Sequence, residues 1–431
     1  MFIWEINLNF FCSDAFFLEA KKFMLNFYSQ NARWLLGGFL LTCFSGFGQT
    51  FYISIWGAEI REAFQLSHGG FGFVYMIATL ASAAVLPFVG RLVDIVSVST
   101  TSTIVIVMLS IAAVTMSQAE SLVSLFVAIF LLRLFGQGMM THTAITAMGR
   151  WYARNRGKAV SIATIGHQFS EALGPIIFVS ISFTYGWRES WLFAAAMLLI
   201  LALPVIYLLM RLERIPLSHQ ALQYVEETSI HQWTRSEMLR DRFFWITGIG
   251  VFSPAFIGTS IFFHQDYLIE VNEWSTSLYY NSFALMAITT VCVSLLTGYA
   301  VDRWSAVRLL PLFLIPLGFS CLFLGFFSAS STIFIFMVLL GFSYGMSSTL
   351  FGAIWPEVYG TRNLGSLRAV IVSLMVFMSA AGPGVTGLLI DLGIPFTKQL
   401  IYIGGFCFFA VILMLLSSRV FQARLRIEPV S

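Results

Sequence analysis

Charged residues are scarce in this sequence. Aspartate, glutamate, lysine and arginine together make up only 10% of its 431 residues, whereas aliphatic residues, aromatic residues and cysteine make up 58%. A soluble globular domain carries about 25% charged residues, so this composition excludes a water-soluble fold. It predicts an all-α membrane protein with several spanning helices.

The motifs of enzymes and of metal or nucleotide sites are also missing. There are five cysteines, and none forms a CxxC pair or joins histidines at a metal-binding spacing. The phosphate-binding pattern GxxxxGK[ST] does not occur. We recognise no nucleophile with a nearby base. We therefore expect no catalytic residue, no metal, no cofactor and no nucleic-acid partner.

What the chain does have is a series of apolar runs of about 20 residues, the length that crosses a hydrocarbon core of about 30 Å. All but four of the 24 lysine and arginine residues fall on one side if the N-terminus is cytoplasmic. This positive-inside asymmetry predicts an inner-membrane protein with both termini in the cytoplasm. We count twelve runs, at 34–56, 70–89, 102–118, 122–148, 159–184, 190–210, 243–264, 277–300, 309–327, 332–355, 368–390 and 399–418.

Several residue patterns recur at a fixed offset of 208 residues, in loops and in spans alike. They indicate a duplication of six spans plus six, which would place a substrate site between the halves near mid-membrane. The recurring pairs are Gly90 with Gly298, Asp94 with Asp302, and Gly174-Pro175 with Gly382-Pro383. The expected organisation is a cytoplasmic or interfacial segment (1–32), a first six-helix bundle (33–210), a cytoplasmic linker (211–242), a second bundle (243–418) and a cytoplasmic tail (419–431).

The segment 1–32 matches neither a span nor a signal peptide. Acidic residues interrupt its apolar stretches, and no basic region precedes them. It is either an amphipathic helix in the membrane interface or an extension upstream of a translation start at Met24.

Two charged residues, Arg133 and Glu171, fall near the middle of predicted spans. A central charge costs about 2.5–3.5 kcal/mol on insertion scales, so each needs a compensating partner. They share a depth, because Arg133 precedes Arg150 by about 25 Å of helix and Glu171 follows Gly157 by about 21 Å. One hypothesis is a buried ion pair that locks two spans. The other is that Arg133 binds a solute anion and Glu171, with His167 one turn away, exchanges protons.

A polar stripe follows one face of the first span, at steps of three and four residues from Thr42 to Trp56. Such a stripe either lines a water-filled cavity or holds helices together. Shifted by 208 residues, the Arg133 face falls on Gly341, Gly345, Ser348 and Gly352, so the second half would supply room for the solute. The residues assigned to substrate binding are Gln49, Tyr52, Arg133, Gln137, Ser260 and Tyr344.

Charged and small residues at the ends of spans are assigned to gating. Asp94 and Asp302 occupy equivalent cytoplasmic helix ends, where they would hold the two halves together through charge-assisted hydrogen bonds. On the outer side, the seventh span ends in a histidine followed by an acidic residue. The complete assigned set is Gly90, Arg91, Asp94, Asp302 and Arg303 on the cytoplasmic side and His264 and Asp266 on the outer side.

The paired six-span halves, the charged linker and the Gly-x-x-x-Asp loops resemble the major facilitator superfamily. Within it, Arg150-Trp151-Tyr152, the run Arg156-Gly157-Lys158-Ala159 and Gly166 are similar to the branch of monocarboxylate transporters and oxalate:formate antiporters. The resemblance implies that spans one, four, seven and ten line the cavity and that spans two, five, eight and eleven join the halves. It also implies rocking of the halves without ATP.

The sequence thus predicts a monomeric secondary transporter in a lipid bilayer. It would move a small polar organic solute, a carboxylate-type anion, by alternating access coupled to protons. Two alternatives remain: export of amphipathic organic compounds, and a transporter-like sensor that binds a solute without turnover.

Overall fold

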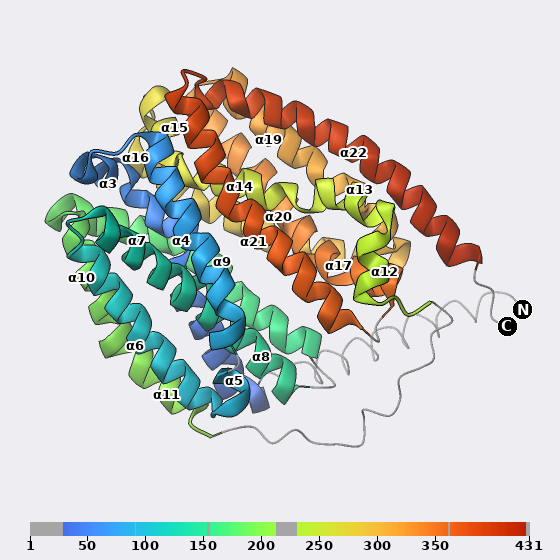
Figure 1. The fold of residues 1–431 in the computed structure, drawn as a ribbon, viewed down its shortest axis with the longest axis horizontal. Helices are drawn as coiled ribbons and strands as arrows, with labels where there is room; N and C mark the ends of the chain where they lie inside the picture. Colours follow the sequence, from blue (N-terminus) through green and yellow to red (C-terminus); the bar gives the residue numbers. More distant parts are fainter. Residues whose placement is uncertain (1–28, 91, 153–155, 213–230, 361–362, 428–431) are drawn as a thin grey trace, which may run out of the picture.

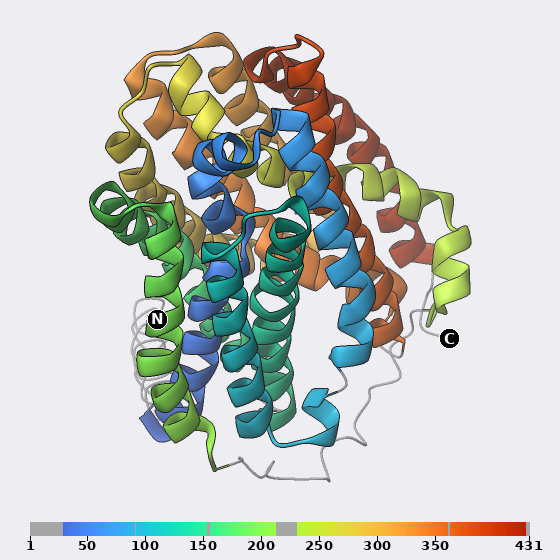
Figure 2. The same ribbon diagram turned by 60° about the vertical axis from the view of Figure 1, so that its left-hand side comes forward.

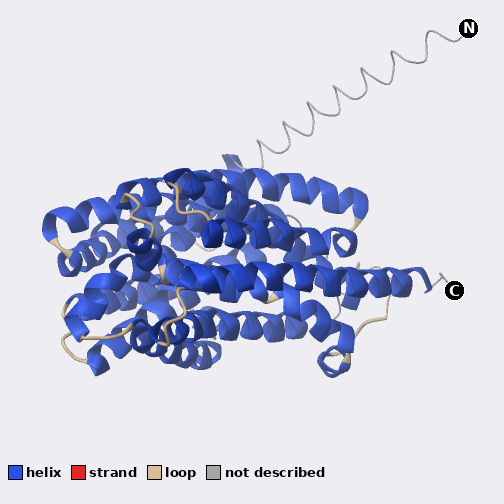
Figure 3. Ribbon diagram, turned by 90° about the horizontal axis from the view of Figure 1, so that it is seen from above, coloured by secondary structure: helices blue, strands red, loops and turns tan. Residues whose placement is uncertain are grey.

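The computed structural model describes residues 29–90, 92–152, 156–212, 231–360 and 363–427. Within these ranges the regular structure is helical, and no strand is present. Ten helices of the described part of the chain are long and apolar enough to cross a membrane. Figure 3 shows the long helices running along a common direction, as spanning helices of one bilayer must.

The first half begins with a helix over residues 29–44 and then follows the chain as a series of long and short helices. These are η1 (Ser45–Gly48), α2 (Thr50–Ile53), η2 (Ser54–Trp56), α3 (Gly57–Phe64), α4 (His68–Val89), α5 (Leu92–Ile95), α6 (Val98–Ser117), α7 (Leu122–Leu131), η3 (Leu132–Met140), α8 (Thr141–Trp151), α9 (Arg156–Tyr185), α10 (Trp187–Met197), η4 (Leu198–Ala202) and α11 (Leu203–Met210).

The second half has the same general plan, with fewer interruptions inside its long helices. Its elements are α12 (Arg235–Arg240), α13 (Arg242–Val251), α14 (Ser253–Phe263), α15 (Gln265–Val271), α16 (Thr276–Asn281), α17 (Phe283–Trp304), α18 (Ala306–Leu309), η6 (Leu310–Phe313), α19 (Leu314–Phe326), α20 (Ser330–Tyr359), α21 (Leu364–Asp391) and α22 (Phe396–Ile427).

Two further helices, the first and fifth spans, bring the number to twelve. The first is shortened by a break in the helix, and the fifth is less apolar because it carries polar side chains. The first span is interrupted after residue 44 by η1, α2 and η2. The fifth, α9, carries His167 and Glu171 among small polar residues. The predicted all-α fold of twelve helices in two six-helix bundles is confirmed.

The duplication is visible in the backbone as well as in the sequence. Trp56 (φ −103°, ψ 28°) and His264 (φ −100°, ψ 26°), which are 208 residues apart, adopt nearly the same turn at the end of the first and seventh spans. Ser54 Oγ donates a hydrogen bond of 2.5 Å to the carbonyl of Phe262, again 208 residues away. Equivalent positions of the two halves therefore meet directly.

The two halves contact each other mainly through α4 against α21 and α9 against α17. Figures 1 and 2 both show α4 (blue) running beside α21 (orange-red) through the centre of the molecule. These are the second, eleventh, fifth and eighth spans, the four that the family resemblance implied.

Among the described residues, the polar contacts between the halves lie toward the end of the molecule away from Met210 and Thr234, the two ends of the joining segment. We call the end with that joining segment the linker side and the other end the far side. On the far side, Asp391 Oδ2 accepts hydrogen bonds from Ser67 Oγ (2.6 Å) and Gly69 N (2.9 Å). Asp391 thereby caps the first turn of α4 in the other half, where a carboxylate also suits the helix dipole.

Candidate functional site

A cavity of about 320 Å³ lies between the two halves and takes its walls from both. The first half contributes the broken part of the first span, one residue of η3 and one face of α9. The second half contributes α14, α20 and one residue of α21. The lining residues are Gln49, Thr50, Phe51, Gln137, His167, Glu171, Pro254, Ala255, Gly258, Thr259, Phe262, Tyr344, Ser347, Ser348, Phe351 and Met375.

The break in the first span brings backbone and side chains to this cavity. After η1, Gln49 has extended dihedral angles (φ −87°, ψ 157°), so the helix restarts in a new direction at Thr50. The break is possible because Gly48 and Gly136 let η1 and η3 cross at backbone contact; a Cβ added to Gly136 would lie 2.6 Å from Gly48 Cα. Gln49, Thr50 and Phe51 therefore face the cavity in succession.

The fourth span is wound as a π-helix over η3, which contains both Arg133 and Gln137. Such segments place one extra residue in each turn and are frequent at functional sites. Here they separate two residues expected on one face. Gln137 lines the cavity, whereas Arg133 lies behind its wall, with its side chain only 1% exposed.

Arg133 is held by the first and second spans. Its Nη1 donates to the Gly48 carbonyl (3.1 Å) and approaches Thr50 Oγ1 (3.4 Å), and its guanidinium lies 5.3 Å from the centre of the Tyr75 ring. Nε and Nη2 are buried without a hydrogen-bond partner among the described residues. The predicted ion pair with Glu171 is absent between these two described side chains, so that hypothesis is wrong for this conformation.

Glu171 and His167 both face the cavity from α9, as expected for neighbours at i and i+4. Glu171 is 7% exposed, and no hydrogen bond or ion pair joins its carboxyl group to another described residue. The His167 ring packs edge-on against Phe51, at 5.9 Å between ring centres. The site thus combines an unpaired carboxyl group with an imidazole at its edge.

The second half supplies hydroxyl groups and aromatic rings, and Tyr344 is the one ionisable residue among the described residues that line the cavity on that side. The Tyr344 hydroxyl fits against α14 only because residue 258 is glycine; a Cβ there would overlap it. Ser347 and Ser348 follow on the same stretch of α20. Phe262 and Phe351 add apolar surface. This wall can hold a solute by hydrogen bonds and by contact with rings.

Besides Arg133, two other predicted binding residues do not line this cavity. Tyr52 lies inside the first bundle, with its ring against Trp56, Phe178 and Trp191. It points away because the 3-10 segment η1 shifts the helical face that the regular stripe assumed. Ser260 is fully buried, and its hydroxyl donates to the Phe256 carbonyl within α14 (2.8 Å).

Two of the three glycines predicted to supply room on the tenth span do not do so. A Cβ on Gly341 would lie 2.6 Å from the Met286 carbonyl, and one on Gly345 would lie 2.6 Å from the Thr290 carbonyl. Both glycines therefore allow close packing of α20 on α17. The cavity instead borders the serines and the tyrosine of α20. Their hydroxyl groups were a usable signal, since Ser348 falls on the shifted Arg133 face.

The far-side residues assigned to gating do lie between the halves. The Asp266 carboxylate forms an ion pair with Arg61 (2.7 Å), and each side chain is 12% exposed. His264 is buried, its ring centre lies 5.8 Å from that of His68 in the first half, and its Nε2 is 3.0 Å from Thr386 Oγ1 on α21. Arg61 is a partner that sequence reasoning missed.

The linker-side gating residues are described only in part. Gly90 ends α4. Arg303 is exposed near the end of α17, with its guanidinium 5.8 Å from the Trp304 ring centre. Arg91 lies outside the described residues, as do the side chains of Asp94 and Asp302.

Comparison with known proteins decides the family. Residues 38–383 match the Major Facilitator Superfamily. The chain belongs to this superfamily. A crystal structure of a bacterial homologue of the human lysosomal transporter Spinster, inward-facing and unoccupied, superposes with a TM-score of 0.70 at 16% identity, over 91% of this chain and 98% of that one. The nucleoside transporter NupG superposes with a TM-score of 0.62 at 13% identity, over 91% and 99%.

A sequence relative supports the predicted branch. Mouse monocarboxylate transporter 14 is 27% identical over 180 residues, which cover 42% of this chain and 34% of that protein. The match therefore spans about a third of that relative's length. Family and fold are those of transporters and not of enzymes, so this superfamily member is a multi-pass membrane protein whose ligand is a small-molecule solute.

Proposed function

We propose that this superfamily member is a proton-coupled secondary transporter of a small carboxylate-type anion. The observation that carries the proposal is the composition of the cavity between the halves. Its wall holds one unpaired carboxyl group, Glu171, and one imidazole, His167. Directly behind that wall lies Arg133, a buried guanidinium with two nitrogens, Nε and Nη2, that have no hydrogen-bond partner among the described residues.

The anionic end of the solute would bind where the first half is most polar. Thr50 and Gln137 face the cavity there, and Thr50 Oγ1 lies 3.4 Å from Arg133 Nη1. A carboxylate bound to these two side chains would feel the guanidinium charge at close range in low-dielectric surroundings. The apolar body would rest on Phe262 and Phe351. This arrangement orients the solute with one polar end toward the first half.

The proton would travel on Glu171. A buried carboxyl group without a hydrogen-bond partner can take up and release a proton as its surroundings change, and such residues mark proton pathways in transporters. His167 lies one helical turn away, within reach as a relay. Loading of the anion near Arg133 and of the proton on Glu171 would make the loaded site neutral.

Alternating access would use the contacts already described. The Arg61–Asp266 pair and the Asp391 cap of α4 hold the far side together, while a solved structure of similar fold is inward-facing. A state open toward the far side requires both contacts to break. We assign the linker side to the cytoplasm on the charge distribution, and a monomer as the transporting unit.

The test is uptake into proteoliposomes with an imposed proton gradient. We expect labelled short-chain monocarboxylates to accumulate when the proton gradient points inward, and unlabelled monocarboxylates to compete. Amides of the same size are the control solutes, because they keep the shape and lose the charge. Equal competition by acids and amides would contradict an anion site.

A second candidate, transport of amphipathic organic compounds, is favoured by one observation. No lysine or arginine appears among the residues that line the cavity, whereas three phenylalanines and a tyrosine do. A thermal-shift screen separates the two functions, because a ligand of the native state raises the melting temperature. Stabilisation by neutral or cationic amphiphiles, without stabilisation by monocarboxylates, would favour this second function.

A further inference from the structure

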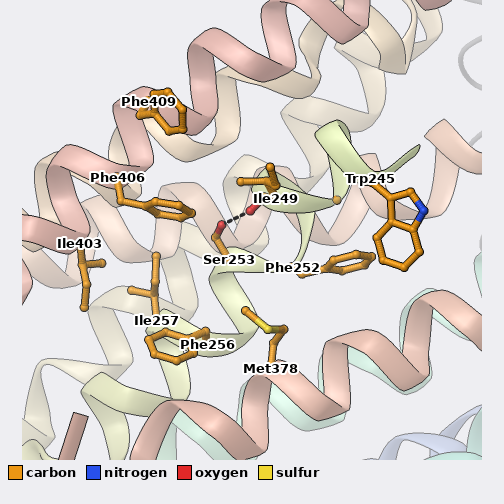
Figure 4. A pocket seen from close by; sticks show the side chains of 11 residues that line it. Trp245, Ile249, Phe252, Ser253, Phe256, Ile257, Met378, Ile403, Phe406 and Phe409 are labelled. Carbon is orange, nitrogen blue, oxygen red and sulfur yellow. Dashed lines mark hydrogen bonds between the residues drawn. The ribbon is translucent and has the colours of Figure 1, made fainter. Parts of the chain in front are cut away.

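A second hollow, of about 580 Å³, lies in the second half. Figure 4 shows its side chains converging from α13 and α14 on one side, α21 below and α22 opposite. They include Trp245, Ile249, Phe256 and Phe406, and the lining is almost wholly apolar. Ser253 is the polar exception, and its hydroxyl already donates to the Ile249 carbonyl. We call this hollow the α13–α22 groove.

The groove faces lipid and has the length of one bilayer leaflet. Trp245, Ile249 and Phe406 are 45%, 40% and 42% exposed, so this surface contacts the membrane. From Trp245 to Ile257 the helix rises about 18 Å at 1.5 Å per residue. Half of a hydrocarbon core of about 30 Å is about 15 Å. The groove therefore runs from the linker-side interface to about mid-membrane.

A free positive charge marks its linker-side end. Arg242, Trp245, Ile249, Phe252 and Phe256 follow one another at steps of three and four residues, which places Arg242 on the groove face of the helix. Arg242 is exposed, with its guanidinium 5.0 Å from the Phe243 ring centre. It forms no hydrogen bond or ion pair with another residue that the structure describes.

The interface position is supported by two neighbours. The Trp245 indole N–H donates to the Leu239 carbonyl (2.9 Å). Tryptophan is typically found at the membrane–water interface, where its ring contacts apolar groups and its N–H contacts polar ones. Arg240, just before α13, is exposed as well. By contrast, the Arg424 guanidinium nearby is already neutralised by Asp241 (2.6 Å). Arg240 and Arg242, neither of which forms a hydrogen bond or ion pair with a described residue, thus lie at headgroup depth.

We propose that the α13–α22 groove binds a phospholipid with an anionic headgroup from the linker-side leaflet. One acyl chain fills the apolar groove, and the phosphate binds Arg242. Anionic lipid is favoured because unpaired basic residues at a helix end attract it and zwitterionic lipid does not neutralise them.

The groove and the central cavity share one wall. Ser253 and Phe256 of α14 face the groove, while their neighbours Pro254 and Ala255 face the cavity. On α21, Met378 faces the groove and Met375 the cavity. A bound acyl chain therefore supports the wall at the break between α13 and α14, so the lipid stabilises the geometry of the solute site.

The first experiment measures lipid retention by native mass spectrometry of the purified full chain. Phosphatidylglycerol and phosphatidylcholine with identical acyl chains are offered in turn. We expect the protein to retain phosphatidylglycerol in preference to phosphatidylcholine. Arg242→Gln should retain phosphatidylglycerol about fivefold less well, which is the effect of one basic residue near an anionic lipid. The matched control is Arg308→Gln, which removes an exposed linker-side arginine of α18 and should change nothing. Equal retention of the two lipids, or by parent and Arg242→Gln, overturns the proposal.

The second experiment fills the groove. Ile249→Trp adds a large ring on an exposed groove side chain and should abolish retention of both lipids. Ile288→Trp, on an exposed residue of α17 away from the groove, is the control for an added tryptophan. Melting temperature and gel filtration report folding and oligomeric state. Undiminished lipid retention by Ile249→Trp overturns the groove as the site, as does a dimer of the parent that Ile249→Trp dissociates.

Discussion

The two halves of this transporter share a backbone plan but not a chemistry. The fourth span is wound as a π-helix around Arg133, whereas its counterpart α20 runs unbroken from Ser330 to Tyr359, with Gly341 at the position equivalent to Arg133. The fifth span carries Glu171, and the equivalent position of α21 is Ser379. The two halves thus share the same helical arrangement. Among the described residues that line the cavity, the carboxyl group and the imidazole come from the first half, and the second half contributes only the Tyr344 hydroxyl as an ionisable group.

This asymmetry gives the cavity a direction. A solute between two identical walls could bind in either orientation, whereas here the first wall offers a carboxyl group and an imidazole and the second offers hydroxyl groups and rings. In the second half, close helix packing fixes the position of the cavity wall, since Gly345 lets α20 pack against the α17 backbone. Variants of one half, each compared with a matched control, therefore test what that half contributes.

The largest effect is expected for Glu171→Gln. If Glu171 carries the proton, this variant should lose accumulation of solute against a proton gradient yet still exchange labelled for unlabelled solute. Ser379→Ala, at the equivalent position of the second half, should keep both activities. Proteoliposome uptake and counterflow measure the two activities separately. Proton-driven accumulation by Glu171→Gln would remove Glu171 from the mechanism.

The next effect concerns Arg133→Met. Because Nε and Nη2 of this buried guanidinium have no hydrogen-bond partner among the described residues, removing the guanidinium should leave the melting temperature unchanged or higher. Solute affinity should fall by a factor of about ten or more, which corresponds to a loss of roughly 1.4 kcal/mol of binding free energy. Arg133→Lys keeps the charge without the planar fork and should fall between the two. Parent-like affinity in Arg133→Met would show that the charge has no part in binding.

The spans could be predicted from the sequence more completely than the faces of the helices could. Apolar run length and the charge of the loops predicted twelve helices, because membrane insertion constrains both strongly. The face on which a side chain lies was harder to predict. Arg133 was expected in the cavity from a period of 3.6 residues, and the π-helix rotates it behind Thr50. Tyr52 also lies away from the cavity, because the 3-10 segment η1 interrupts the regular helix before it.

Inter-helix glycines give an intermediate effect. Gly345→Ala should destabilise the protein by about 1–3 kcal/mol, since its Cβ would lie 2.6 Å from the Thr290 carbonyl and one helix must shift. Gly352→Ala on the same helix should be nearly neutral, because its Cβ would meet only the Arg368 side chain at 3.9 Å. Thermal unfolding of both variants in detergent compares them. Equal melting temperatures would contradict the close α17–α20 contact.

The far-side contact between the halves should respond to Asp391→Asn. The substitution weakens the charge-assisted hydrogen bonds to Ser67 and Gly69 by about 1–2 kcal/mol, so states open on the far side should become more populated. Spin-label distances across the far side measure the population. Glu62→Gln, which removes an exposed carboxylate of α3 in the first half, is the control. An unchanged distance distribution in Asp391→Asn would exclude this contact from the conformational equilibrium.

The smallest effect concerns the linker-side ends of the first and seventh spans, which the two halves secure differently. In the first half, Arg33 donates to the carbonyls of Leu209 (2.6 Å) and Leu208 (2.7 Å). At the equivalent position of the second half, Asp241 accepts two hydrogen bonds from Arg424 (2.6 and 3.1 Å). Carbonyl acceptors do not titrate, whereas a carboxylate does, so only the second attachment should depend on pH.

The sign of that dependence follows from the Asp241 pKa. Burial alone would raise the pKa, but hydrogen bonds from Arg424, the Phe243 N–H and Tyr359, together with the Arg424 charge, hold it below its ordinary value. A lowered pKa means that the stabilisation is complete above about pH 4, the unfolded value, and is lost as the pH falls through the folded one. Asp241→Asn should therefore cost about 1 kcal/mol at pH 7, a value discounted because Arg424 is partly exposed, and progressively less below pH 4. Arg33→Gln should show a constant difference from the parent across the same range. Melting temperatures of the three proteins between pH 3 and pH 7 make the comparison, and a pH-independent effect of Asp241→Asn would contradict a charged Asp241 in the folded protein.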